Sequence, residues 1–159
     1  MALLYNPVHT PELELIALQA EALFLVARAQ DASIADRDIG LREVAALPLI
    51  LPSRPNALRM LIESQMASIG CKPRLSLEID GISAILDLVG DAAGYAVLPR
   101  HAVAYSGRPH DFRVCAIVQP QLSSRLVIAS AASRPHTHTQ TATLALVQAV
   151  AAQVFPGSG

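Results

Sequence analysis

The sequence has little aromatic content, few cysteines and almost no net charge. It contains no Trp, and aromatic residues make up only 4% of the chain. Its two cysteines, Cys71 and Cys115, lie far apart, which excludes a disulfide framework and a cysteine-based metal motif. We interpret both as small buried apolar residues in a reducing compartment. The 12 Lys and Arg residues balance 13 Asp and Glu residues, which argues against a large nucleic-acid-binding surface on this chain.

Long hydrophobic runs are also missing. The longest apolar stretches, such as residues 144–155, are interrupted by Gln or bounded by Pro, and they fall short of the roughly 20 residues that span a bilayer. Residues 1–7 lack the basic start of a signal peptide. The sequence has 159 residues of which 52% are hydrophobic, enough for a buried core and too apolar for a disordered chain. These features predict a soluble, cytoplasmic globular protein with no membrane partner.

The middle of the chain alternates between two periodicities. Apolar residues recur at helical spacing in two segments, which begin after Pro55 and after Gly81, and three apolar or alternating segments are typical of strands. Such alternation predicts an open α/β sheet with right-handed crossovers. The expected order is strand 49–51, helix 56–69, half-buried strand 74–79, helix 82–92 and strand 95–98.

The two ends of the chain give a weaker pattern. Strands are predicted at residues 3–5, 113–118 and 125–130, followed by a helix at 139–155 that Thr137 or Thr139 caps. Residues 12–28 are ambiguous. Their Leu, Ala, Glu and Gln content favours a helix, whereas the spacing of their leucines also fits strands.

The most informative local feature is the passage from residues 49–51 into a polar loop and then a helix. Open α/β sheets bind ligands at the carboxyl ends of their strands, and a helix N-terminus favours an anion there. Ser53 adds a hydroxyl donor, and Arg54 can bind a carboxylate through two hydrogen bonds. The alternative is that Ser53 or Asn56 only caps the helix and Arg54 points into solvent.

Asp80, Gly81 and Ile82 occupy the equivalent position after the next strand, so they are candidates for the same crevice. The alternative for Asp80 is an ordinary helix cap. His136 and His138 have no further ligand nearby in the sequence, so we predict no metal site. A Gly-x-Ser-x-Gly motif and a cysteine with a neighbouring base are both absent from the sequence, and we predict no enzymatic activity and no cofactor.

Five segments in this order resemble the effector-binding domain of LysR-type transcriptional regulators. The likeness covers nearly the whole chain, and the subgroup that includes nitrogen-assimilation control regulators is the most similar. The matching segments are residues 2–7, 21–26, 47–55, 77–80 and 94–99.

The resemblance implies an α/β fold like the type II periplasmic binding proteins, with two α/β subdomains and a small-molecule effector in the cleft between them. Residues 17–122 would form the second subdomain, and residues 1–16 and 123–159 would be parts of an incomplete first one. Residues 12–28 would form two strands, including a crossover. The family's effector loop matches Pro52, Ser53, Arg54, Pro55 and Asn56, and Asp80, Gly81 and Ile82 would line the other side of the cleft.

The family's helix-turn-helix and linker helix have no counterpart in this sequence, so DNA would be contacted only through a region missing from this chain. The resemblance therefore implies an effector-sensing and oligomerisation module, a homo-oligomer such as a dimer or tetramer, that binds a small anionic metabolite. The alternative is a solute-binding protein of a transport system with the same fold, which the missing signal peptide disfavours.

Overall fold

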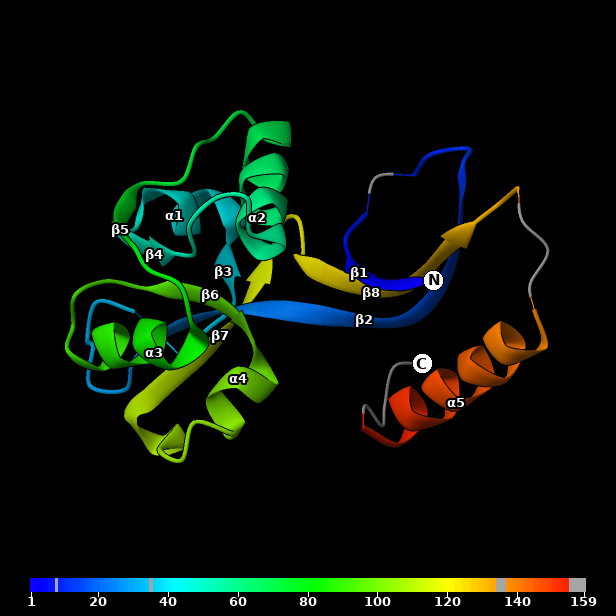
Figure 1. Cartoon of the computed structure of the whole chain (residues 1–159). Helices are drawn as coiled ribbons and strands as arrows, with labels where there is room; N and C mark the ends of the chain where they lie inside the picture. The colour runs from blue at the N-terminus through cyan, green and yellow to red at the C-terminus, as the bar shows by residue number, and fades with distance from the viewer. Residues whose placement is uncertain (8, 35, 134–136, 155–159) are drawn as a thin grey trace. The chain divides into compact units, whose positions relative to one another are not determined.

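The computed structural model describes residues 1–7, 9–34, 36–133 and 137–154 (Figure 1). The chain forms two compact units, which we call unit 1 and unit 2. Unit 1 comprises Met1–Glu21 and Ser124–Gly159, and unit 2 comprises Ala22–Ser123. The subdomain boundaries expected from the family resemblance, at 16/17 and 122/123, stay predictions.

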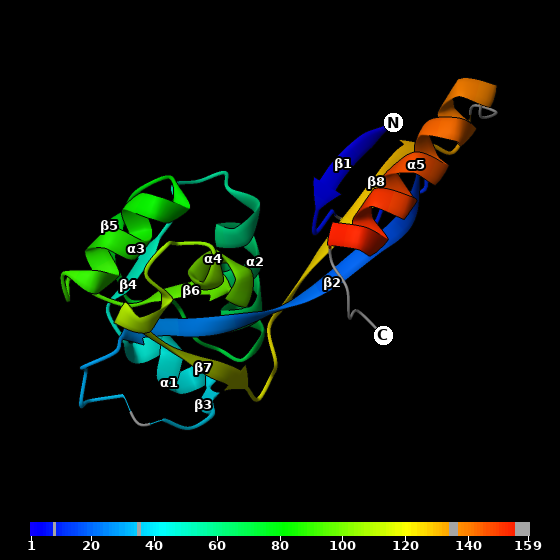
Figure 2. The same ribbon diagram turned by 90° about the horizontal axis from the view of Figure 1, so that it is seen from below.

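Unit 2 is built around the second half of a long strand, β2 (Leu13–Arg28). Its residues pair antiparallel with β6 (Ala96–Pro99) on one side and with β7 (Phe112–Val118) on the other (Figures 1 and 2). A short strand, β3 (Ile39–Gly40), pairs parallel with β7. The ambiguous segment is therefore a strand and not a helix. The expectation of two strands was wrong, because a single continuous strand of 16 residues runs through the segment.

The predicted alternation of strands and helices is confirmed. The order is β4 (Leu49–Leu51), α2 (Ala57–Ser68), β5 (Leu75–Glu78), α3 (Ile82–Gly90) and then β6. β4 pairs parallel with β5, and a parallel bridge joins Leu49 to Tyr95, the residue just before β6. The carboxyl ends of these strands consequently lie at the same edge of unit 2.

Apolar side chains of unit 2 form two clusters on the two faces of β2. Leu25 belongs to one cluster and Val26 to the other, because successive strand residues point to opposite faces. Two helices supply each cluster. The first contains residues of α2 and of the short helix α1 (Leu41–Ala46), and the second contains residues of α3 and of α4 (Arg100–Ala104). Sequence periodicity missed α1 and α4, which have only 6 and 5 residues.

The two cysteines differ in their exposure. Cys115 on β7 is buried, at 3% exposed, and belongs to the first cluster. Cys71, in the loop after α2, is only half-buried. Both are free thiols, and the interpretation of Cys71 as a buried residue was wrong, because the loop after α2 leaves it partly open to solvent.

The prediction of a strand at residues 74–79 is confirmed, but the prediction that this strand is half-buried was wrong. All four residues of β5 are exposed, and Leu75 and Leu77 are each 40% exposed. The alternating pattern indicated a strand correctly, but it does not show whether anything covers the apolar face. Residues on both faces of β5 are exposed to solvent in the part of the chain that the structure describes.

Unit 1 contains β1 (Ala2–Tyr5), which pairs antiparallel with β8 (Ser123–Ala131), and helix α5 (His138–Val154). The predicted cap is confirmed, because Thr137 Oγ1 accepts a hydrogen bond of 3.2 Å from the Gln140 amide. Gln140 Oε1 accepts in return from the Thr137 amide at 3.0 Å. The predicted helix end at Phe155 lies outside the described residues. None of the described helices is long and apolar enough to cross a membrane.

Candidate functional site

The loop that follows β4 ends in a capped helix. Asn56 Oδ1 accepts hydrogen bonds from the amides of Leu58, at 2.9 Å, and Arg59, at 3.4 Å. Asn56 is therefore the N-cap of α2, and its side chain is occupied by that task. Ser53 is not the cap, and its hydroxyl has no hydrogen-bond partner among the described residues.

Asp80 connects the two predicted loops. Its Oδ1 atom accepts a hydrogen bond of 3.0 Å from the Ser53 amide. The N-cap position of α3 is occupied by Gly81, with a φ of 95° and no side-chain cap bond, so the alternative that Asp80 only caps this helix was wrong. The contact forms because β4 and β5 are neighbouring parallel strands, whose carboxyl ends bring Ser53 and Asp80 together.

A buried arginine that the sequence analysis missed holds the start of this loop. Arg59 is only 6% exposed and donates to the Pro52 carbonyl oxygen at 3.1 Å. It also donates to Glu63 Oε1 at 2.5 Å and to Glu78 Oε1 at 3.0 Å. These contacts join the loop, α2 and β5, so Arg59 fixes the start of the loop that follows β4. The only sequence signal was the spacing of Arg59 and Glu63, four residues apart on a helix.

Arg54 is partly exposed, and only some of its guanidinium N–H groups have described hydrogen-bond partners. Its Nε and Nη2 atoms both donate to Glu63 Oε2, at 3.1 and 2.7 Å, while its side chain stays 65% exposed. Burial raises the pKa of Glu63, but hydrogen bonds from Arg59 and Arg54 outweigh it and hold that pKa below its usual value. Glu63 is therefore an ionised anchor, and Arg54 Nη1 has no partner in the described part of the chain.

The remaining predicted residues have separate positions. Pro55 precedes the cap, and Gly81 supplies the positive φ at the turn into α3. Ile82 is 46% exposed and lines a cavity of about 270 Å³ between α3 and α4, together with Tyr105 and Arg108. The described residues thus bring the Ser53 amide and Asp80 together and place the Arg54 side chain against Glu63, whereas Ile82 lines a separate cavity.

Metal ligands do not gather in this region. The described residues contain no group of three or more His, Cys, Asp or Glu side chains that could hold an ion. His138 begins α5, and His136 lies outside the described residues.

With this geometry in place, comparison with known proteins identifies the family. A family model, the LysR substrate binding domain, matches residues 1–152. The chain belongs to this family. Its mixed α/β architecture is the periplasmic-binding-protein-like type II fold of LysR effector-binding domains, as predicted.

Solved structures of this family share the fold at low sequence identity. The CcmR regulatory domain of Synechocystis PCC6803 in complex with 2-PG is 17% identical and has a TM-score of 0.78, with 94% of this chain and 72% of that chain covered. The effector-binding domain of QuiR in complex with shikimate is 20% identical, with a TM-score of 0.72 and coverages of 96% and 73%. The reduced OxyR regulatory domain of Pseudomonas aeruginosa is 17% identical and has a TM-score of 0.72, with 94% of this chain and 70% of that chain covered.

Proposed function

We propose that this LysR-family chain is the effector-sensing module of a cytoplasmic transcriptional regulator, in the subgroup that resembles nitrogen-assimilation control regulators. Its effector loop is Pro52, Ser53, Arg54, Pro55 and Asn56, and Asp80, Gly81 and Ile82 form the facing turn. The module binds its ligand without transforming it. DNA is contacted by a region other than this chain.

The observation that carries the proposal is the hydrogen bond between the Ser53 amide and Asp80. It joins two loops at the carboxyl ends of neighbouring parallel strands, which is where open α/β sheets bind ligands. The buried Arg59 holds the start of the same loop by donating a hydrogen bond to the Pro52 carbonyl oxygen. A loop held from two directions is preorganised, which lowers the entropy lost when a ligand binds.

The available polar groups suggest the chemistry of the effector. Arg54 Nη1 and the Ser53 hydroxyl are donors for an anionic group. The Asp80 carboxylate accepts hydrogen bonds and repels a second negative charge, so a hydroxyl on the ligand suits it. A small hydroxylated acid satisfies both requirements. The 2-PG and shikimate bound by two structural relatives support a small metabolite as ligand.

The experiment is a thermal-shift titration with small carboxylates and phosphates, including shikimate and 2-PG. We expect at least one compound to raise the melting temperature, and Arg54→Gln to weaken its binding about tenfold, the effect of losing one charge-assisted hydrogen bond. Arg37→Gln is the matched control, because Arg37 is about as exposed as Arg54 and forms an ion pair of the same length, 2.7 Å, with Glu43. Equal loss in both variants, or none in either, would contradict the assignment of Arg54.

We also propose that the module forms a homo-oligomer through β5. This strand pairs with β4 alone in the described sheet and exposes Leu75 and Leu77, and an open strand edge with apolar residues favours pairing with another chain. Leu77→Lys should lower the mass measured by analytical ultracentrifugation to that of a smaller species. Leu146→Lys on α5, another exposed leucine, should leave the mass unchanged. An unchanged mass in Leu77→Lys would exclude β5 from the interface.

A further inference from the structure

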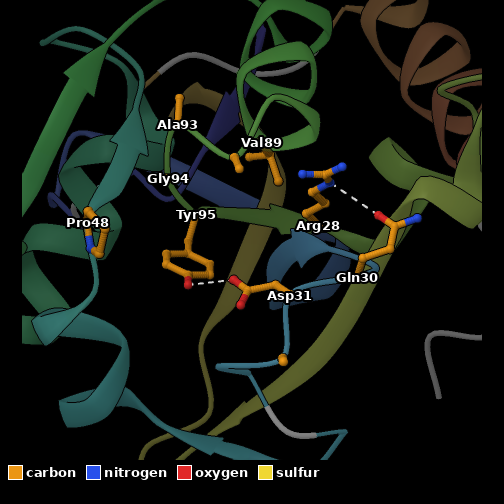
Figure 3. A pocket seen from close by; sticks show the side chains of 10 residues that line it. Arg28, Gln30, Asp31, Pro48, Val89, Ala93, Gly94 and Tyr95 are labelled. Atoms are coloured by element: carbon orange, nitrogen blue, oxygen red, sulfur yellow. Dashed lines mark hydrogen bonds between the residues drawn. The ribbon is translucent and has the colours of Figure 1, made fainter.

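A second polar pocket lies within unit 2, away from the effector loop. It has a volume of about 360 Å³, within the usual range of small-molecule sites. Arg28, Gln30 and Asp31 line it from the end of β2 and the loop beyond, and Val89, Gly94 and Tyr95 line it from the end of α3 and the start of β6 (Figure 3).

The carboxylate in this pocket is held in a fixed position. Tyr95 donates its hydroxyl proton to Asp31 Oδ2 at 2.6 Å, and the Ser33 hydroxyl and amide donate to Asp31 Oδ1 at 2.6 and 2.9 Å. Hydrogen bonds from Ser33 and Tyr95 lower the pKa of Asp31, so it is ionised at neutral pH. Burial and the neighbouring Asp31 raise the pKa of Tyr95, which keeps its phenol protonated.

The loop that carries Asp31 is also held in place by an arginine on the neighbouring strand β7. Arg113 on β7 donates to the carbonyl oxygens of Ala29 and Asp31, each at 2.9 Å, and to that of Ile34. On the other wall, a Cβ atom on Gly94 would lie 2.6 Å from the Pro48 carbonyl oxygen, so only glycine allows this turn to approach β4 so closely. Contacts within the protein therefore fix both walls of the pocket, so the pocket is preformed.

Several polar groups on these walls remain available to a ligand. Arg28 uses its Nε atom to donate to Gln30 Oε1 at 3.2 Å, and its two terminal amino groups have no partner among the described residues. Each hydroxyl has a single proton, so Tyr95 and Ser33, which give theirs to Asp31, keep lone pairs that can accept hydrogen bonds. The pocket thus offers cationic donors at Arg28 and anionic or neutral acceptors around Asp31.

We propose that this pocket is a second ligand site, for a small zwitterion of the α-amino acid class. The ligand carboxylate binds the free amino groups of Arg28, and its ammonium group binds Asp31 and the Tyr95 oxygen. The apolar side chains of Pro48, Val89 and Ala93 leave space for a short aliphatic side chain.

This site is separate from the effector loop, at the opposite end of the same strand. Pro48 precedes β4 and lines the second pocket, whereas Pro52 follows β4 and begins the effector loop. The three residues of β4 lie between the two prolines, and the four steps from Pro48 to Pro52 span about 13 Å of extended strand. The two sites therefore share β4 and share no ligand-binding residue.

The test is amide chemical-shift mapping on the ¹⁵N-labelled full chain with L-alanine and L-leucine as probes. Propionate and ethylamine, which each carry one of the two charged groups of alanine, serve as partial probes. We expect an amino acid to shift the amides of Asp31, Gly94 and Tyr95, and both partial probes to bind at least tenfold more weakly than alanine. Shifts confined to residues 52–56 and 80–82, or no shifts with any probe, would overturn the proposal.

Two variants complete the test. Arg28→Gln, at an exposed position, should weaken amino acid binding at least tenfold without unfolding the chain, and Asp31→Asn should do the same through the ammonium group. Arg54→Gln should leave amino acid binding unchanged, which separates this site from the effector loop. Unchanged binding in Arg28→Gln would overturn the site, whatever the outcome of the effector titration.

Discussion

The two ends of the parallel strands in unit 2 hold an aspartate in different ways. At the carboxyl end, Asp80 accepts from the backbone amide of Ser53, and the adjacent loop depends on the buried cation Arg59. At the opposite end, Asp31 accepts from two hydroxyls and an amide, and its loop depends on Arg113 bound to backbone carbonyls. Each end also leaves one exposed arginine, Arg54 or Arg28, with donors that have no described partner.

This difference indicates how each end responds to substitution. The effector-loop end contains ion pairs with an almost fully buried partner, and removal of one partner leaves a charge without compensation. The other end is held by hydrogen bonds to neutral hydroxyls, each of which contributes less to the free energy of unfolding. Substitutions should therefore have larger effects on stability at the effector-loop end.

The largest effect is expected for Arg59→Met. The variant keeps an apolar stem but removes the donor to Pro52 and to both carboxylates, so the free energy of unfolding should fall by about 3 kcal/mol. Urea denaturation measures this change. Arg42→Met is the matched control, because Arg42 is exposed although it also donates to a carbonyl, that of Ile69 at 2.8 Å. A loss below about 1 kcal/mol for Arg59→Met would show that the buried cluster is not the anchor of the loop.

Gly94→Ala should have the next largest effect, at the opposite end. Its Cβ atom would lie 2.6 Å from backbone and 3.1 Å from Ile50 Cγ1, and overpacking of this kind costs about 1–3 kcal/mol. The same urea experiment measures it. Gly40→Ala is the control, because its Cβ atom would make only an ordinary contact at 3.5 Å with Glu43. Equal stabilities of the two variants would argue against the tight turn at Gly94.

Asp31→Asn should cost about 1–2 kcal/mol at neutral pH, since it weakens hydrogen bonds to a charged acceptor. Because folding lowers the pKa of Asp31, its contribution is present above the unfolded value near pH 4 and is lost as the pH falls further. The stability difference between wild type and variant should therefore shrink from pH 7 to pH 3. Thermal unfolding across that range measures it, and a constant difference would contradict the assignment.

The smallest effect is expected for Arg37→Gln. Arg37 and Glu43 form an ion pair of 2.7 Å with both side chains more than half exposed, at 58% and 53%. Such exposed pairs contribute little to the free energy of unfolding, and salt screens them. Urea denaturation at low and high salt should show little change. A loss as large as that of Arg59→Met would remove the distinction between buried and exposed ion pairs on which the comparison rests.

Much of the fold was predictable because it depends on local patterns. The apolar run at Leu49–Leu51, the capped helix after Asn56 and the Thr137 cap each leave a signal within a few residues. The exposure of β5 was not predictable. Whether anything covers Leu75 and Leu77 depends on how distant segments pack, and alternation along a strand cannot show that.

The candidate site was predictable only in part. The positions of Ser53 and Asp80 after neighbouring strands follow from the α/β order, but the hydrogen bond between them competes with an ordinary helix cap, and local sequence does not decide between the two. The pocket at Asp31 left no local signal. Asp31 and Tyr95 are 64 residues apart, and only the paired strands bring them together.

The central claim is that the loops at Pro52–Asn56 and Asp80–Ile82 bind the effector. Its most direct test is amide chemical-shift mapping on the ¹⁵N-labelled chain, with the compound that raises the melting temperature most. The account predicts that the largest shifts occur at Ser53, Arg54 and Asp80, and that Arg54→Gln reduces them while Arg37→Gln does not. Shifts that avoid these loops, or that persist unchanged in Arg54→Gln, would contradict it.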